Sequence, residues 1–150
     1  MISMLGVLSL VILLLSVGAL ILHYRLLQLR GALDDSFSGL DELLRVRLEI
    51  IYDIANTMEN SHELKERCIR YSGREVRAII KSMPKFHKAI AATHIENDIK
   101  TALTENTHEI ERSIRTYNEN LLKYNTYVSK PPGIILAFAV GLKSEKQIAI

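Results

Sequence analysis

Two pairs of glutamate and histidine, each with two residues between the partners, form the pattern in this sequence that is most typical of metal binding. They are Glu59 with His62 and Glu105 with His108. In ferritin-like bundles, such pairs on two helices are joined by glutamates from two further helices, and all of them project inward toward iron. The apolar periodicity around each pair places it outside the helix face that is expected to be buried. The pattern therefore predicts solvent-exposed side chains and no metal site.

The other residue types capable of chemistry are isolated from one another. His87 and His94 are seven residues apart and have no third ligand at a defined spacing, which favours ordinary surface histidines. Cys68, the single cysteine, lies near the apolar side of its predicted helix and is interpreted as a small core residue. The seven glycines are scattered, so no phosphate-binding loop is expected. We therefore expect no catalytic residue, no cofactor and no enzymatic activity.

Charged residues are divided between two neighbouring segments of opposite sign. Residues 34–63 carry eight acidic and two basic side chains, whereas residues 65–88 carry eight Lys or Arg and two acidic side chains. On a single helix the basic residues would step by three and four and form one face, called here the basic stripe. It consists of Arg67, Arg70, Arg74, Arg77, Lys81, Lys85 and Lys88. A solvated outer face is the favoured interpretation, and a surface for an anionic partner stays open.

The N-terminal segment has the composition of a membrane span. Residues 1–22 contain no charge and no proline. As a helix they would extend about 33 Å, enough to cross a hydrocarbon core of roughly 30 Å. A cleaved signal peptide would need a basic start and a small-residue cleavage site, and neither is present. We therefore expect an uncleaved transmembrane anchor over residues 1–22.

The residues that follow the span indicate its orientation. Arg25 and Arg30 come after it, and no Lys or Arg comes before it. Because basic residues favour the inner side of a membrane, the rest of the chain is expected on the cytoplasmic side of the cell (inner) membrane. A single cysteine excludes an internal disulfide and agrees with a reducing compartment.

Three long helices are expected after the span, the first of which continues it without a break to about residue 60. Its predicted core positions are Leu33, Phe37, Leu40, Leu44, Ile51, Ile54 and Met58, with one step of seven across Arg47. A second helix over 62–83 would be capped by Ser61 or Asn60 together with Glu63. Gly73 would weaken the middle of this helix, and Pro84 would kink or end it.

The third long helix is expected to begin between residues 93 and 98 and to end near residue 130. Its core positions would be Leu103, Thr107, Ile110, Ile114, Tyr117, Leu121, Tyr124 and Val128. Tyr117 and Tyr124 thus occupy one core position of successive heptads, and Asn118 and Asn125 stand beside them at the flank. Pro131 and Pro132 would stop the helix, since neither can donate a backbone hydrogen bond.

The segment GIILAFAVGLK, residues 133–143, is apolar but too short to cross a bilayer. A short helix that covers one end of the bundle is favoured, and an interfacial helix on the membrane stays open. The predicted fold is all-α, with a transmembrane helix that runs into an elongated antiparallel bundle, or coiled coil, of about three long helices and a short C-terminal helix. The expected parts are the anchor at 1–22, the bundle at 23–143 and a tail at 144–150.

The end of the chain carries a recurring motif. It contains Tyr117-Asn118, Tyr124-Asn125, Pro131, the run IILAFAV and Gly141-Leu142-Lys143. This order is similar to the C-terminal signature of the LemA family of bacterial membrane-anchored helical proteins. The stretch LDDSFSGLDELLRVR (33–47) resembles that family's acidic-aromatic segment, with Phe37 where a tryptophan is usual. The resemblance implies a divergent member with a helical bundle on one anchor and no established enzymatic activity.

The function expected from these features is a membrane-anchored scaffold or interaction module for an unidentified protein partner. The alternative is a binder of anionic lipid headgroups or nucleic acid through the basic stripe on residues 67–88. Nucleic acid is the less favoured ligand, because only Tyr71 interleaves an aromatic ring and the acidic first helix would repel it. Self-association into a homo-oligomer stays open.

Overall fold

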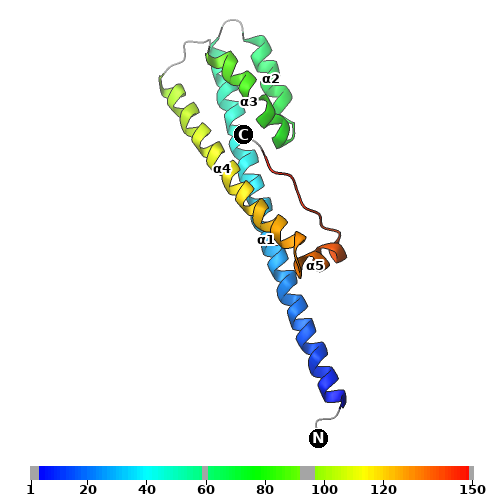
Figure 1. Ribbon diagram of the computed structural model, residues 1–150. Helices are drawn as coiled ribbons and strands as arrows, with labels where there is room; N and C mark the ends of the chain where they lie inside the picture. The colour runs from blue at the N-terminus through cyan, green and yellow to red at the C-terminus, as the bar shows by residue number, and fades with distance from the viewer. Residues whose placement is uncertain (1–3, 59–60, 92–96, 149–150) are drawn as a thin grey trace. The chain divides into compact units, whose positions relative to one another are not determined.

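The computed structural model describes residues 4–58, 61–91 and 97–148, and over these ranges the chain is helical apart from turns and an extended tail (Figure 1). The helices are α1 (Met4–Thr57), α2 (His62–Ser72), α3 (Val76–Ala91), α4 (Asn97–Ser129) and α5 (Gly133–Val140). None of the described residues lies in a strand. The predicted all-α class is confirmed.

The longest helix is α1, which continues for 54 residues without interruption. No proline occurs within it, and its four glycines are isolated from one another, so nothing in the sequence forces a break. The predicted continuation of the apolar N-terminal segment into the first helix of the bundle is therefore confirmed. Figure 1 shows it as one unbroken ribbon from blue to cyan.

The chain divides into two compact units, and α1 and α4 contribute to both. The first unit comprises residues 1–34 and 119–147, and the second comprises residues 35–118 and 148–150. In the first unit, Asn120 Nδ2 donates to the carbonyl of Ala32 at 3.2 Å, and the Tyr127 hydroxyl donates to the carbonyl of Leu22 at 2.9 Å. The residue that lies later in α4 thus contacts the residue that lies earlier in α1, so the two helices are antiparallel in this unit, as predicted.

The core of the second unit follows the predicted heptads of α1 with two exceptions. Buried positions on this helix include Leu40, Leu44, Leu48, Ile51 and Ile54. Phe37 lies at the edge, with 38% of its surface exposed, and its ring centroid is 5.7 Å from that of Tyr117. Met58 is half-buried. The gap of seven residues that the apolar pattern leaves between Leu44 and Ile51 is filled by Arg47, which is buried.

The predicted second helix is wrong in one respect, because the chain forms two helices there. Helix α2 ends at Ser72, and α3 begins at Val76 after a turn that contains Gly73. Glycine costs about 1 kcal/mol relative to alanine inside a helix, and tertiary contacts decide whether it breaks. Here the Tyr71 and Phe86 rings meet edge to face at 5.7 Å, so α2 and α3 pack against each other. Pro84 lies inside α3 and does not end it.

The predicted cap of α2 is not formed by Ser61. Its hydroxyl donates to the carbonyl of Met58 at 3.0 Å, and no side-chain hydrogen bond caps the helix. Ser61 therefore closes the turn after α1. Asn60, the alternative cap, lies outside the described residues.

Two glycines fix the ends of α5. A Cβ atom on Gly133 would collide with the backbone carbonyl of Tyr127 and lie 2.9 Å from its Cδ1, so only glycine permits this close approach. Gly141 has φ of 71°, the left-handed conformation that ends many helices. Its N–H donates to Phe138, and the Leu142 N–H donates to Ala137 at 2.8 Å.

The short C-terminal helix was expected to cover one end of the bundle and so to bury its apolar side chains, but most of the apolar side chains of α5 are exposed. Gly133 and Ala137 are its buried residues, whereas Phe138 is 88% exposed. Ile134, Ile135 and Val140 are exposed as well. Helix α4 ends at Ser129, just before the two prolines, as predicted.

Candidate functional site

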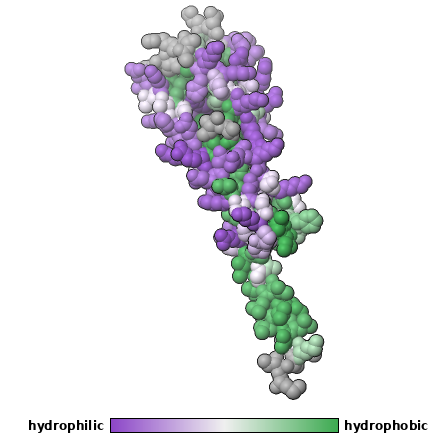
Figure 2. Space-filling model, in the orientation of Figure 1, coloured by the Kyte–Doolittle hydropathy of each residue, from purple (hydrophilic) through white to green (hydrophobic). Residues whose placement is uncertain are grey.

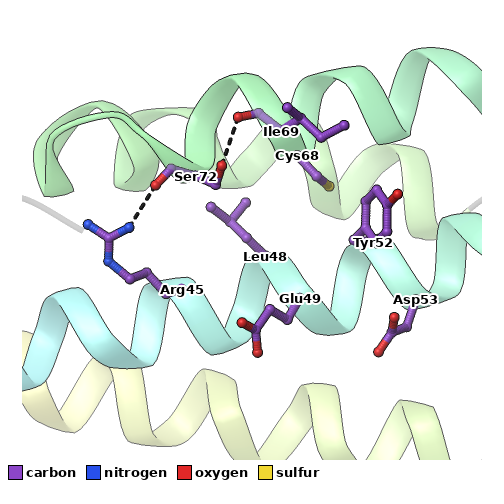
Figure 3. Close-up of a pocket in the computed structure, with 8 residues that line it drawn as sticks. All are labelled: Arg45, Leu48, Glu49, Tyr52, Asp53, Cys68, Ile69 and Ser72. Carbon is purple, nitrogen blue, oxygen red and sulfur yellow. Dashed lines mark hydrogen bonds between the residues drawn. The ribbon is translucent and has the colours of Figure 1, made fainter.

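A groove of about 460 Å³ lies between α1 and α2 in the second unit (Figure 3). Helix α1 contributes Arg45, Leu48, Glu49, Tyr52 and Asp53, and α2 contributes Cys68, Ile69 and Ser72. Leu48 of α1 and Cys68 of α2 project between the two helices, and polar groups lie at the ends and the rim of the groove. Sequence reasoning did not identify this groove, because it depends on how α2 packs on α1.

One end of the groove is closed by Arg45. Its Nη1 atom donates to the carbonyl of Ser72 at 2.7 Å, and its Nε atom donates to Asp41 Oδ2 at 2.9 Å. Ser72 is the last residue of α2, where helix carbonyls lack intrahelical donors and attract cations. The Arg45 side chain therefore links the end of α2 to α1, and its hydrogen bonds are made to Ser72 and Asp41.

The floor of the groove is apolar and chemically inert. Leu48 and Cys68 are buried, and Figure 3 shows Leu48 and Tyr52 projecting toward α2. Burial raises the pKa of the Cys68 thiol to about 11. The thiol is thus protonated at neutral pH, and since the thiolate is the nucleophile, Cys68 serves as a wall and not as a reactive group.

The rim of the groove is acidic and open. The carboxylates of Glu49 and Asp53 lie along the same edge and point away from α2 (Figure 3). Ile69, on the opposite helix, is 63% exposed. An apolar floor with exposed carboxylates beside it suits an apolar side chain that is followed or preceded by a positive charge.

A buried arginine, which sequence reasoning missed, lies deeper in the second unit. Arg47 is 2% exposed, and its Nη1 atom donates to the carbonyl of Leu103 and to Thr107 Oγ1, both at 2.6 Å. Its Nη2 atom lies 2.8 Å from Nε2 of His87. Because a guanidinium only donates, the Nε2 atom of His87 accepts in this contact. Arg47 thereby links α1 to α3 and α4.

The buried guanidinium of Arg47 is only partly compensated. Burial lowers the pKa of its guanidinium, and none of the partners named above is a carboxylate. Among the described residues, the buried Nε atom of Arg47 and the buried Oδ1 atom of Asn106 have no hydrogen-bond partner. The only feature of the sequence that points to the burial of Arg47 is the seven-residue gap in the apolar heptads. Charged residues are rarely buried at such a core position.

The tyrosines of the repeated motif are core residues, as predicted. Tyr117 is 1% exposed and Tyr124 is buried as well. The Tyr124 hydroxyl donates to the carbonyl of Lys143 at 3.3 Å, and burial raises its pKa.

The asparagines of the motif hold the C-terminal tail, a role that sequence reasoning did not anticipate. In the first unit, Asn125 Nδ2 donates to the carbonyl of Glu145, and the Glu145 N–H donates to Asn125 Oδ1, both at 2.9 Å. In the second unit, Asn118 makes the same two-bond contact with Ile148, at 2.9 and 3.1 Å. A side-chain amide can donate from its NH2 group and accept at its oxygen, so it can pair with both backbone groups of one residue.

The basic stripe does not exist as one helical face, because the helix breaks at Gly73. Arg67 and Arg70 lie on α2, Arg74 lies in the turn, and Arg77, Lys81, Lys85 and Lys88 lie on α3. Arg67 is half-buried and paired with Glu63. The other basic side chains of the set are exposed, on two helices that pack against each other.

The glutamate–histidine pairs are on the surface where they are described. His62, His108 and Glu105 are exposed, as predicted, and the nearest carboxylates to the two histidines are Glu66 at 3.5 Å and Glu111 at 3.9 Å. Glu59 and His94 lie outside the described residues. Within the described ranges, no three His, Cys, Asp or Glu side chains gather as metal ligands would.

The N-terminal part of α1 is the only segment of the described chain that is long and apolar enough to cross a membrane. Its large side chains are exposed, and Figure 2 shows hydrophobic residues over this part of the helix. No protein-family model, no curated protein and no solved structure matches this chain.

Proposed function

We propose that this chain is a single-pass protein of a bacterial cell membrane, of the LemA type, whose cytoplasmic bundle binds another protein. One observation carries the proposal: an uncharged, exposed apolar helix continues without a break into the core helix of a packed bundle. The first half of α1 then serves as the anchor and the second half as the scaffold on which α2, α3 and α4 pack.

The exposure of the anchor supports a location in lipid. Leu15 and Leu20 are 69% and 67% exposed, and other apolar residues between Val7 and Ile21 are similar. Removing a large aliphatic side chain from water stabilises by about 1.5–3 kcal/mol, so this surface favours a hydrocarbon environment. Arg25 and Arg30, on the C-terminal side of the span, support a cytoplasmic bundle.

The groove between α1 and α2 supports the choice of partner. Leu48 and Cys68 provide an apolar floor, and Glu49 and Asp53 provide negative charge at its open edge. The partner segment therefore carries an apolar side chain next to Lys or Arg. Binding is preferred to catalysis because the Cys68 thiol is protonated at neutral pH. The division of the basic stripe between two helices makes it the weaker surface for a ligand.

Photo-crosslinking in cells tests this function. A photoreactive residue at Ile69 should capture a protein, and Glu49→Lys with Asp53→Lys should abolish the capture. The same residue at Glu109, an exposed position on α4, serves as the control for random encounter. The matched charge control is Glu105→Lys with Glu109→Lys, which should leave capture at Ile69 intact. Equal capture at Ile69 and Glu109, or capture indifferent to the groove reversal, would refute the proposal.

A further inference from the structure

The first unit brings the end of α4 beside the end of the apolar span. The Tyr127 hydroxyl donates to the carbonyl of Leu22 at 2.9 Å, and Leu22 is the last residue of the uncharged N-terminal segment. In a helix that crosses the membrane, the residues just after such a segment lie at the level of the lipid headgroups. Tyr127 and its neighbours therefore reach the same level, provided that α1 is the anchor proposed above.

A hollow of about 510 Å³ lies at this level, and its polar lining is cationic. Arg25, Lys123 and Lys130 contribute to it together with Thr126, and Leu29 and Leu122 provide apolar surface. No acidic residue lines the hollow. None of its three cations forms an ion pair with another described residue, so their charges are available to a ligand.

Helix α5 begins at the edge of this hollow and leaves its apolar side chains uncovered. Gly133 lines the hollow and packs on the backbone of Tyr127, which fixes where α5 starts. Ile135 and Phe138 are then 71% and 88% exposed. Every residue from Ile134 to Val140 is uncharged. Short apolar helices of this kind lie in the boundary between headgroups and acyl chains when cations beside them meet anionic lipid.

We propose that α5 lies in the membrane interface and that the hollow binds the phosphate of an anionic phospholipid. Arg25, Lys123 and Lys130 face the phosphate, and Thr126 donates its hydroxyl hydrogen to it. Leu29 and Leu122 contact the upper acyl chain, and Phe138 enters the interface beside it. A phospholipid is preferred to a protein because the hollow combines three cations with apolar walls and adjoins the span. The inference rests on the proposed membrane anchor, and it adds a second, lipid-selective contact to it.

Tryptophan fluorescence tests the position of α5, because the chain has no tryptophan of its own. The full-length variants Phe138→Trp, Leu15→Trp and Ile69→Trp are reconstituted in phosphatidylglycerol–phosphatidylcholine vesicles. Phe138→Trp should be quenched most by lipids brominated near the headgroup, Leu15→Trp by lipids brominated deep in the chain, and Ile69→Trp by neither. If Leu15→Trp is quenched and Phe138→Trp is not, α5 is outside the membrane and this inference alone fails. If Leu15→Trp is not quenched either, the anchor fails with it.

Native mass spectrometry tests the phosphate site. Full-length protein released from nanodiscs with equal phosphatidylglycerol and phosphatidylcholine should retain phosphatidylglycerol preferentially. The triple change Arg25→Gln, Lys123→Gln and Lys130→Gln should reduce that preference by at least tenfold. The matched change Lys81→Gln, Lys85→Gln and Lys88→Gln should not alter it. Millimolar inorganic phosphate should leave the lipid bound, since free phosphate lacks the acyl contacts. Equal loss in both triples, or displacement by free phosphate, would overturn the proposal.

Discussion

The side-chain amide of Asn125 pairs with both backbone groups of Glu145, and both of its hydrogen bonds are 2.9 Å long. The two hydrogen bonds resemble those that a residue of an antiparallel strand exchanges with its partner, except that a side-chain amide takes the place of the neighbouring backbone. Asn118 holds Ile148 in the same way in the second unit. The asparagines of the repeated motif therefore act on the tail, while the tyrosines beside them act on the core.

The first prediction is that replacing Asn125 releases the C-terminal tail. Asn125→Ala removes two hydrogen bonds worth about 1 kcal/mol each in net terms. We expect the Glu145 amide to exchange with deuterium roughly 5 to 30 times faster, with little change in melting temperature. Hydrogen-exchange mass spectrometry of the C-terminal peptide measures this exchange rate. Glu119→Ala, an exposed change on α4, is the control and should leave the exchange rate unaltered. An unchanged rate in Asn125→Ala would mean that the two bonds do not restrain the tail.

Replacing the buried arginine gives the second prediction. Arg47→Met fills the heptad gap with an apolar side chain of similar length and removes a buried charge that no carboxylate compensates, so it should cost less folding free energy than a truncation. Arg47→Ala leaves a cavity and should destabilise by roughly 2–5 kcal/mol. Chemical denaturation followed by circular dichroism compares the two variants. If Arg47→Met were as destabilised as Arg47→Ala, the links from Arg47 to α3 and α4 would matter more than packing.

Truncating a tyrosine of the motif should cost more folding free energy than removing only a hydroxyl group. Tyr117→Ala removes a side chain that is 1% exposed and should cost roughly 2–4 kcal/mol of folding free energy. Tyr124→Phe loses one hydrogen bond, to the carbonyl of Lys143, and should cost only about 1 kcal/mol. Urea denaturation midpoints provide the comparison. A tolerant Tyr117→Ala would contradict the assignment of the motif's tyrosines to the core.

Alkaline pH should weaken the fold through Cys68. Burial raises the pKa of its thiol from 9.0 to about 11, so the folded state favours the neutral thiol. The resulting stabilisation is fully present below pH 9 and is lost as the pH rises through 11. Alkylation by iodoacetamide should accordingly follow a titration near pH 11 in the folded protein and near pH 9 in denaturant. Rapid alkylation of the folded protein at pH 8 would show that the thiol is not buried as described.

The long helices could be predicted from sequence, whereas the break between α2 and α3 could not. Gly18, Gly31 and Gly39 lie inside α1 without consequence, and Gly73 ends a helix. The local cost of glycine is similar at all of these positions. What differs is the packing of Tyr71 on Phe86, which forms only when the chain reverses between them. A tertiary contact of this kind leaves no periodic signal.

The sites depend even more on partners that are distant in sequence. Arg47 was visible as a gap in the apolar heptads, but its acceptors lie 40 to 60 residues away on α3 and α4. The tail has no apolar periodicity from which its position could be predicted, and asparagine side chains hold its backbone instead. The apolar composition of α5 is visible in the sequence, but the contact between Tyr127 and Leu22, which brings the end of α4 to the end of the uncharged N-terminal segment, is not.

Labelling of a single cysteine in cells tests the membrane-anchored bundle most directly. In a Cys68→Ser background, Ser38→Cys places one thiol at an exposed position of α1 beyond the span. The protein should pellet with membranes after an alkaline wash, and an impermeant maleimide should label it only once the cells are permeabilised. Labelling of intact cells would reverse the orientation, and release of the protein into the alkaline supernatant would contradict the anchor itself.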